Sequence, residues 1–288
     1  KFLPVKSSKA STTGVIDNGY EGIIYAADHG CQIINNSWGG PAGGQFGQDA
    51  ITYATINRQC LVIASAGNDS KELTNYPASY NYVLSVAATT STDAKSGFST
   101  YAYSVDVCSP GSGIYSTVYN NTYSSMDGTS MAGPICAGAA AIVKSFYPSY
   151  TGLQVGEQLK VIADNIYSVG SNNSYKDKLG TGRINLYKAL TVSSPSVKMS
   201  PINIIDKNDE VFIAGDTLLI TGKIINYLAA AGNVTATLST TNTNVTILNP
   251  VLNAGALGTL ASFDVNSSNA YKVVIKPSAA TNENVLFK

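Results

Sequence analysis

The sequence predicts an α/β fold in which a parallel sheet carries helices on both faces, followed by an all-β sandwich domain. In the first two thirds of the chain, short β-branched runs such as residues 61–64 and 83–88 alternate with helical patterns such as 48–57 and 130–147. This alternation is typical of strands covered by helices on both sides. After Pro201 only short alternating runs remain, which indicates a β-sandwich.

We therefore expect two domains, residues 1–190 and 201–288, joined by a linker at 191–200. The expected linker is rich in serine and proline and follows neither the helical nor the strand period. The last apolar run ends the chain without a turn, so we expect the sandwich to be incomplete. The strands expected in this second domain are residues 216–226, 234–238, 245–248, 271–275 and 285–288.

Charge and composition predict a secreted globular protein. Lysine plus arginine and aspartate plus glutamate balance at 18 each, so no basic field is available to hold nucleic acid. No apolar run reaches membrane-spanning length, and we expect no membrane partner. Low charge with many Ser, Thr, Asn, Gly and Tyr residues is typical of extracellular surfaces, which favours an extracellular or cell-surface location.

The four cysteines, Cys31, Cys60, Cys108 and Cys136, are interpreted as small buried residues. Each stands at the start of, or inside, an apolar strand or helix, where a free thiol behaves as a small hydrophobic group. None has the Cys-x-x-Cys spacing of a zinc site. A disulfide formed outside the cell remains open as an alternative.

Ser130 lies in the run Asp-Gly-Thr-Ser-Met-Ala-Gly-Pro at 127–134, between a glycine turn and a helix of small residues. At a helix N-terminus, free N–H groups and the positive dipole end stabilise a developing negative charge. Pro134 is expected in the first turn, where its missing N–H breaks no helical bond. The run predicts a reactive serine, and the alternative is a serine that only caps a buried helix.

Several segments, in order along the chain, resemble the subtilisin-like serine protease family. Residues 127–134 resemble its nucleophile signature, 33–40 (Ile-Ile-Asn-Asn-Ser-Trp-Gly-Gly) its cleft-lining strand and loop, and 61–68 the strand that ends at its oxyanion asparagine. The resemblance covers roughly residues 1–190 and implies a serine endopeptidase that cleaves peptide bonds through a Ser130 acyl-enzyme. Further matching segments are 76–79, 83–88, 99–101, 105–111 and 180–186.

The resemblance assigns the oxyanion donor to Asn68, together with the backbone N–H of Ser130. From the residues alone, Asn68 also suits a left-handed turn position after Gly67. The resemblance further implies that an extended peptide binds between two edges of a cleft, with a core-anchor role for Trp38 as the alternative. The residues implied to bind substrate are Ser37, Trp38, Gly39, Ser65, Ala66, Gly67 and Thr129.

The family pattern also requires an aspartate and a histidine upstream of these segments, and the chain contains neither motif. Residues 1–6 resemble the strand that follows the family's histidine motif. We therefore expect a fragment that is inactive alone and whose partner is a missing N-terminal segment carrying both residues. His29, the only histidine, ends a helical pattern at 21–30 with Gly30 as C-cap, and is interpreted as structural.

Two other functions were weighed against the protease. An α/β-hydrolase needs Gly-x-Ser-x-Gly and a later histidine, but Ala132 holds the last glycine position and no histidine follows. A non-catalytic binding protein on the same scaffold remains the alternative. No cofactor is expected. The family often binds calcium, but Asp93, Asp106 and Asp127 are too widely spread to be assigned as ligands.

Overall fold

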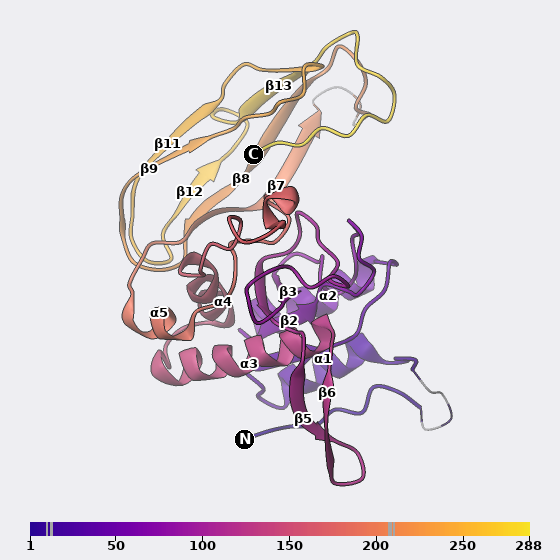
Figure 1. The fold of residues 1–288 in the computed structure, drawn as a ribbon. Coiled ribbons are helices and arrows are strands. Elements are labelled where there is room, and N and C mark those ends of the chain that lie inside the picture. Colours follow the sequence, from indigo (N-terminus) through magenta and orange to yellow (C-terminus); the bar gives the residue numbers. More distant parts are fainter. Residues whose placement is uncertain (10, 12–13, 207–208, 210) are drawn as a thin grey trace. The chain divides into compact units, whose positions relative to one another are not determined.

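The computed structural model describes residues 1–9, 11, 14–206, 209 and 211–288, which divide into two compact units, Lys1–Val192 and Ser193–Lys288 (Figure 1). The first unit ends with helix α5 (Leu186–Thr191), and the second begins with strand β7 (Val197–Asp206). The expected linker is therefore too long, because only residues 192–196 lie outside a helix or strand. Pro201 lies where the register of β7 shifts, a place that tolerates a missing N–H.

A four-stranded parallel sheet forms the centre of the first unit and confirms the predicted α/β fold. Its strands are β1 (Ile33–Asn36), β2 (Leu61–Ser65), β3 (Val83–Thr89) and β4 (Val107–Pro110), in the order β1-β2-β3-β4. All five residues of β2 are buried, because Leu61 and Ile63 contact one core and Val62 and Ala64 the other. A strand buried on both faces explains its continuous apolar run.

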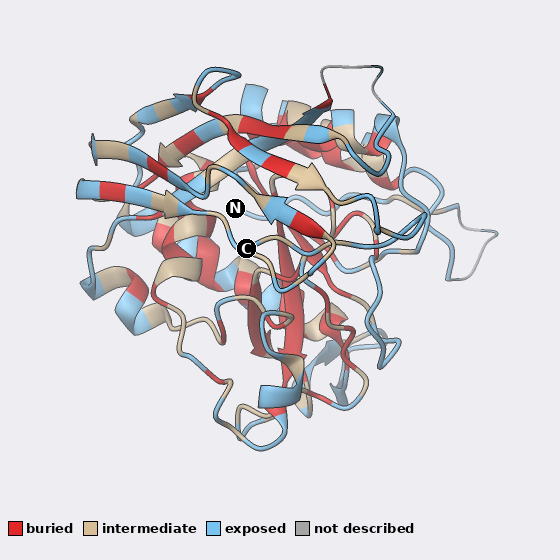
Figure 2. Ribbon diagram, turned by 90° about the horizontal axis from the view of Figure 1, so that it is seen from above, coloured by how far each residue is buried: buried red, intermediate tan, exposed pale blue. Residues whose placement is uncertain are grey.

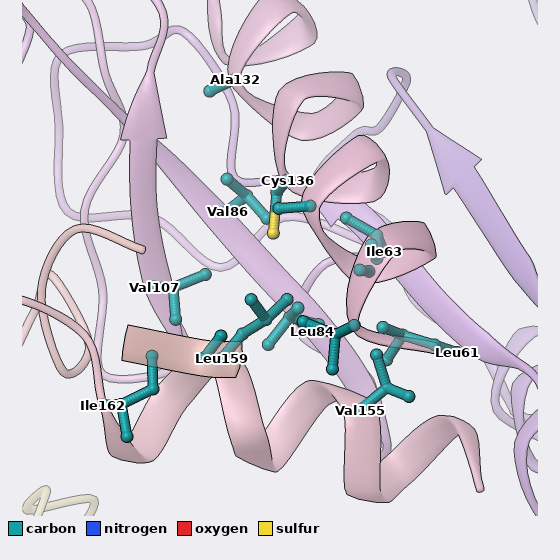
Figure 3. Close-up of a cluster of buried hydrophobic side chains, with 14 of the residues drawn as sticks. Leu61, Ile63, Leu84, Val86, Val107, Ala132, Cys136, Val155, Leu159 and Ile162 are labelled. Carbon is teal, nitrogen blue, oxygen red and sulfur yellow. The ribbon is translucent and has the colours of Figure 1, made fainter. Parts of the chain in front are cut away.

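Helices cover both faces of this sheet, as predicted, and the buried strands lie between them (Figure 2). On one face, Ala132 and Cys136 of one helix and Leu159 of another pack against the sheet (Figure 3). This face is covered by α3 (Thr129–Phe146), α4 (Gly152–Val161) and α5. The opposite face is covered by α1 (Gly19–Asp28), α2 (Gln45–Thr52) and the π-helical turn η1 (Tyr53–Asn57).

A hairpin leads from the sheet to α3 and was not expected from the sequence. Strands β5 (Ile114–Val118) and β6 (Thr122–Met126) pair in antiparallel fashion. The turn between them contains Asn120 and Asn121, both with positive φ angles of 62° and 55°. Asparagine tolerates this conformation, so the Asn-Asn pair between two Ser/Thr/Tyr runs was the available signal.

The start of α4 lies so close to the chain before β2 that only glycine fits there. Gly152 N–H donates to Gln59 C=O at 2.9 Å, and a Cβ on Gly152 would overlap main-chain atoms of Cys60 and Leu61. We expect Gly152→Ala to lower the free energy of unfolding by about 3 kcal/mol or more, because two main chains must separate.

Gly138→Ala is the matched control for this prediction. Gly138 is exposed in α3, and a Cβ there meets no atom within 4 Å, so the change should raise stability by about 0.5–1 kcal/mol. Urea unfolding followed by circular dichroism measures both values. Equal stability of the two variants would show that the close approach at Gly152 is not required.

The second unit consists of two antiparallel sheets, which confirms the predicted all-β sandwich. Its core takes Ile220 and Ile224 from one sheet and Val234 and Leu252 from the other. The larger sheet has the order β10-β13-β8-β12, with β7 also paired to β8, and the smaller sheet pairs β11 with β9. The bounds are β8 (Thr217–Asn226), β9 (Ala231–Thr237), β10 (Val245–Ile247), β11 (Val251–Leu257), β12 (Ser262–Val265) and β13 (Tyr271–Ile275).

The two strands expected at the ends of the chain are not present. Residues 1–6 form no strand and run beside α1, where a Cβ on Gly22 would meet Val5 Cγ1 at 3.3 Å. Residues 285–288 also form no strand. Their Val285 and Phe287 pack against the core of the second unit, while Lys288 and Ser239 exchange main-chain hydrogen bonds of 2.8 and 2.7 Å.

Candidate active site

Ser130 is the second residue of α3, which begins at Thr129. The preceding Gly128 has φ 154° and ψ 156°, a region that is essentially restricted to glycine, and its N–H donates to Gly111 C=O at 2.8 Å. The Ser130 side chain is half-buried, and among the described residues its hydroxyl has one hydrogen-bond partner, the Ser37 carbonyl at a long 3.4 Å. The serine thus lies at a helix N-terminus, and none of the described residues acts as a base that accepts its proton.

Pro134 does not lie in the first turn of α3, as the sequence had suggested, but is its sixth residue. It therefore supplies no N–H to the carbonyl four residues earlier, which belongs to Ser130. The Ser37 hydroxyl donates to this carbonyl at 3.0 Å, and the Ser65 hydroxyl donates to the Thr129 carbonyl at 2.8 Å. Two hydroxyls at the carboxyl ends of β1 and β2 therefore fix the start of α3.

The side-chain amide of Asn68 has a defined orientation. Its Oδ1 accepts hydrogen bonds from both the backbone N–H and the hydroxyl of Thr129, each at 2.9 Å. Since two donors fix the oxygen, Nδ2 faces the other way and lies 3.7 Å from where a Cβ on Gly128 would stand. Within the described chain this Nδ2 has no acceptor. The exposed amide N–H therefore lies at the turn that leads into Ser130.

The turn around Gly67 is fixed by its own hydrogen bonds, which limits its use as a substrate edge. Gly67 has φ 112°, and the Asn75 amide donates to Ala66 C=O at 3.0 Å. The backbone N–H of Ala66 and both backbone groups of Gly67 are also occupied within the protein. The main-chain groups of Ala66 and Gly67 therefore already have partners within the protein.

The segment Ser37, Trp38 and Gly39 differs from that turn. Gly40 exchanges two main-chain hydrogen bonds with Tyr76, of 2.9 and 2.8 Å. Within the described residues, the main-chain groups of Trp38 and Gly39 have no partner, which leaves them available to an extended peptide. The Trp38 ring packs edge-on against Tyr20 of α1, with centroids 5.4 Å apart, so the structure supports its role as a core anchor.

His29 lies near the amino ends of the strands of the parallel sheet, whereas Ser130 lies near their carboxyl ends. It follows α1 and precedes the amino end of β1, whereas Ser37 and Ser130 meet beyond the carboxyl end of that strand. The four residues of β1 span about 13 Å. The His29 Nδ1–H donates to the Tyr25 carbonyl at 2.8 Å, and its ring stacks on Tyr25. His29 thus binds the end of its own helix and cannot serve Ser130 as a base.

Other reactive groups near the site are occupied or inert. Burial raises the pKa of the Cys136 thiol, inside α3, to about 12, so it stays protonated. The described residues contain no group of three His, Cys, Asp or Glu side chains that could hold a metal ion. The three aspartates considered as ligands bind elsewhere: Asp93 to Arg183 at 3.3 Å, Asp106 to Lys160 at 2.8 Å and Asp127 to the Gly113 N–H at 2.6 Å.

The sequence indicated Ser130 and Asn68 but missed the side chains that hold them. The orienting role of Thr129 and the hydroxyl contacts of Ser37 and Ser65 depend on atoms that meet only in three dimensions. The one available signal was a hydroxyl residue at or just after the end of each of two neighbouring parallel strands. Separately, in the parts of the chain that the structure describes, no helix combines the length and apolarity needed to cross a membrane.

Comparisons with known proteins agree on one family. Residues 1–182 match the profile described as "Subtilase family". Thermitase of Thermoactinomyces vulgaris is 43% identical over 189 residues, which cover 66% of this chain and 64% of thermitase. Subtilisin Savinase of Lederbergia lenta is 36% identical over 185 residues, covering 64% of this chain and 66% of that protein. The chain therefore spans slightly less than two thirds of each relative.

Solved structures show the same similarity. A protease from Pseudoalteromonas arctica PAMC 21717 superimposes with a TM-score of 0.55 at 26% identity, over 60% of this chain and 57% of that one. The prenylagaramide maturation protease PagA superimposes with a TM-score of 0.57 at 25% identity, over 66% of this chain and 71% of that one.

Proposed function

Because the chain belongs to the subtilase family, we propose that it supplies the nucleophile and the oxyanion donor of a serine endopeptidase. Ser130 Oγ attacks the carbonyl carbon of a peptide bond, and the carbonyl oxygen becomes an oxyanion. Asn68 Nδ2 and the backbone N–H of Ser130 then donate to that oxygen more strongly than to the ground-state carbonyl. The observation that carries this proposal is the double hydrogen bond from Thr129 to Asn68 Oδ1, which leaves Nδ2 free at the turn before Ser130.

Polypeptide substrates fit the open main-chain groups of Trp38 and Gly39. An extended peptide that pairs with this segment adds one strand to it, and its carbonyl carbon is brought toward Ser130, whose Oγ lies 3.4 Å from the Ser37 carbonyl. Since the Trp38 ring packs against α1, its contribution to substrate binding comes from its backbone. Side-chain preference is then determined by other residues of the cleft.

The base that activates Ser130 comes, in this proposal, from a further polypeptide segment that carries the aspartate and histidine of the family pattern. His29 is the only histidine of the chain, and it lies at the amino ends of the strands, away from Ser130. Without an imidazole at Ser130, the hydroxyl remains a weak nucleophile at neutral pH. The family pattern places both residues before the segments that match here.

An apolar face of α3 supports such a partner segment. Ile135, Ile142 and Phe146 are 36%, 47% and 58% exposed and follow one face of the helix, together with the exposed Gly138. A helix that is apolar on all sides is normally enclosed by protein. Beside it, β1 is an edge strand of the sheet and, within the described residues, pairs only with β2. A segment that adds a strand next to β1 and covers α3 would bury both features.

We also propose that the two units have different roles. The first unit, Lys1–Val192, forms the catalytic part, and the second, Ser193–Lys288, is an immunoglobulin-like accessory domain, which its alternating pattern and two antiparallel sheets support. The low charge of the chain, with 18 basic and 18 acidic residues, favours an extracellular protein.

A fluorophosphonate probe tests this function directly. The chain is mixed with the part of thermitase that lies before its matched region, produced as a separate chain, and treated with the probe. We expect peptide mapping to find the label on Ser130, because only an activated serine reacts, and Ser130→Ala should remove it. A complex that forms but takes up no label would instead indicate a binding protein on a protease scaffold.

A further inference from the structure

Two cysteines meet where α1 passes into β1 and η1 passes into β2. The Cys60 thiol donates to the Cys31 carbonyl at 3.0 Å, and both residues contact the same hydrophobic core. The main chains are already paired here, because Leu61 N–H donates to the Gln32 carbonyl at 2.8 Å. Cys31 is half-buried and Cys60 is buried, and both are free thiols in the structure.

The spacing of the two chains suits a disulfide. Cys31 lies two residues before β1 and Cys60 directly before β2, and both contact the same core. The pairing of Ile33 with Leu61, continued backwards along both chains, puts the two cysteines about one residue out of register. Strands about 4.8 Å apart with a rise of about 3.3 Å per residue separate such Cα atoms by about 6 Å, within the range that disulfides span. We propose that Cys31 and Cys60 form a disulfide bond when the protein meets an oxidising glutathione couple.

The other two cysteines cannot take part without unfolding. Cys108 and Cys136 are fully buried, Cys108 with its thiol against the Leu179 carbonyl and Cys136 inside α3. Burial raises the pKa of each of these thiols to about 12, which removes the thiolate that exchange requires. Only Cys31 is exposed enough to meet a soluble disulfide.

The reaction proceeds in two balanced steps. The Cys31 thiolate attacks one sulfur of oxidised glutathione, forms a mixed disulfide and releases one glutathione thiolate. Cys60 then loses its proton to water and attacks the Cys31 sulfur, which releases the second glutathione thiolate. Two protein thiols are oxidised and one glutathione disulfide is reduced. Burial, with a smaller effect of Cys31, raises the pKa of the Cys60 thiol to about 11. The rate of the second step should therefore rise roughly tenfold for each unit by which the pH is raised, up to a pH of about 11.

The bond would close a loop that contains α2 and η1 and would hold β1 against β2. Cross-links of this loop length restrict the unfolded chain enough to raise the melting temperature of a domain of this size by roughly 5–10 °C. The disulfide is independent of the proposed catalytic chemistry, since neither sulfur contacts Ser130 or Asn68 in the described structure.

The test compares the full chain before and after incubation with oxidised glutathione at pH 9. Non-reducing peptide mapping after alkylation should find residues 31 and 60 cross-linked, with loss of the cross-link on reduction and a higher melting temperature. Cys31→Ser should show neither effect, whereas Cys108→Ser, the matched control, should show both. The proposal is overturned if Cys31 remains glutathionylated while Cys60 stays an alkylatable thiol even at pH 10. Since the wild-type chain alone yields this outcome, the test does not depend on any variant folding.

Discussion

On its own, the chain is expected to cleave casein about 10⁶-fold more slowly than the same chain complemented with the part of thermitase that lies before its matched region. This factor is the one known for subtilisin when its histidine or serine is removed. The physical reason is that, in the part of the chain that the structure describes, the Ser130 hydroxyl bonds a carbonyl at 3.4 Å, while the one histidine of the sequence bonds the Tyr25 carbonyl. Docking of the segment against β1 and α3 would supply the imidazole and restore nucleophilic attack.

Two variants distinguish this explanation from the alternative that His29 acts as the base for Ser130. Ser130→Ala in the complemented protein should return the rate to that of the chain alone. His29→Asn should leave the rate of the complemented protein unchanged, because His29 binds the Tyr25 carbonyl at the amino ends of the strands, away from Ser130. Rapid cleavage by the chain alone that disappears in His29→Asn would refute both the proposed partner segment and the structural role of His29.

Replacing Asn68 by alanine in the complemented enzyme is expected to lower kcat by about 10²–10³ with little change in KM, the size of effect known for the corresponding donor of subtilisin. Asn68 Nδ2 has no acceptor in the described structure, so its hydrogen bond forms only when substrate is present. A donor aimed at the oxyanion acts on the transition state and therefore on kcat. Steady-state kinetics on a short peptide measure both constants.

Thr129→Val refines this experiment. It keeps the shape of the side chain and the backbone N–H but removes the hydroxyl that donates to Asn68 Oδ1 at 2.9 Å. Loss of one of two orienting bonds should lower kcat by about tenfold, and Thr129→Ser, which keeps the hydroxyl, should retain most of the activity. If Asn68→Ala and Thr129→Val raise only KM, then Asn68 binds substrate and does not stabilise the oxyanion.

The parallel sheet could be predicted from the sequence because its strands are buried on both faces and their residues are continuously apolar. Residues 61–64 and 83–88 were expected as strands and lie in β2 and β3. Strand β7 could not be predicted, since most of its residues are exposed and it contains Pro201 at a change of register. Pattern reasoning depends on burial, and an exposed strand that contains a proline gives it little signal.

The candidate site likewise could be predicted from the sequence only in part. The motif order placed Asn68 near Ser130, and the structure joins Asn68 to the neighbouring Thr129 by two hydrogen bonds. The sequence could not show that the Trp38 ring turns away to pack on α1, or that the backbone of Gly67 is already occupied. These facts depend on contacts between segments that are far apart in the chain.

The missing N–H of Pro134 has a consequence for how the protein assembles. A helix formed by residues 129–146 alone would leave the Ser130 carbonyl without its usual donor, and that carbonyl gains one only when the Ser37 hydroxyl arrives at 3.0 Å. The helix is thus complete only once β1 is in position beside it. The start of α3 and the end of β1 therefore depend on each other, and the hydrogen bonding around Ser130 is complete only when both are in place.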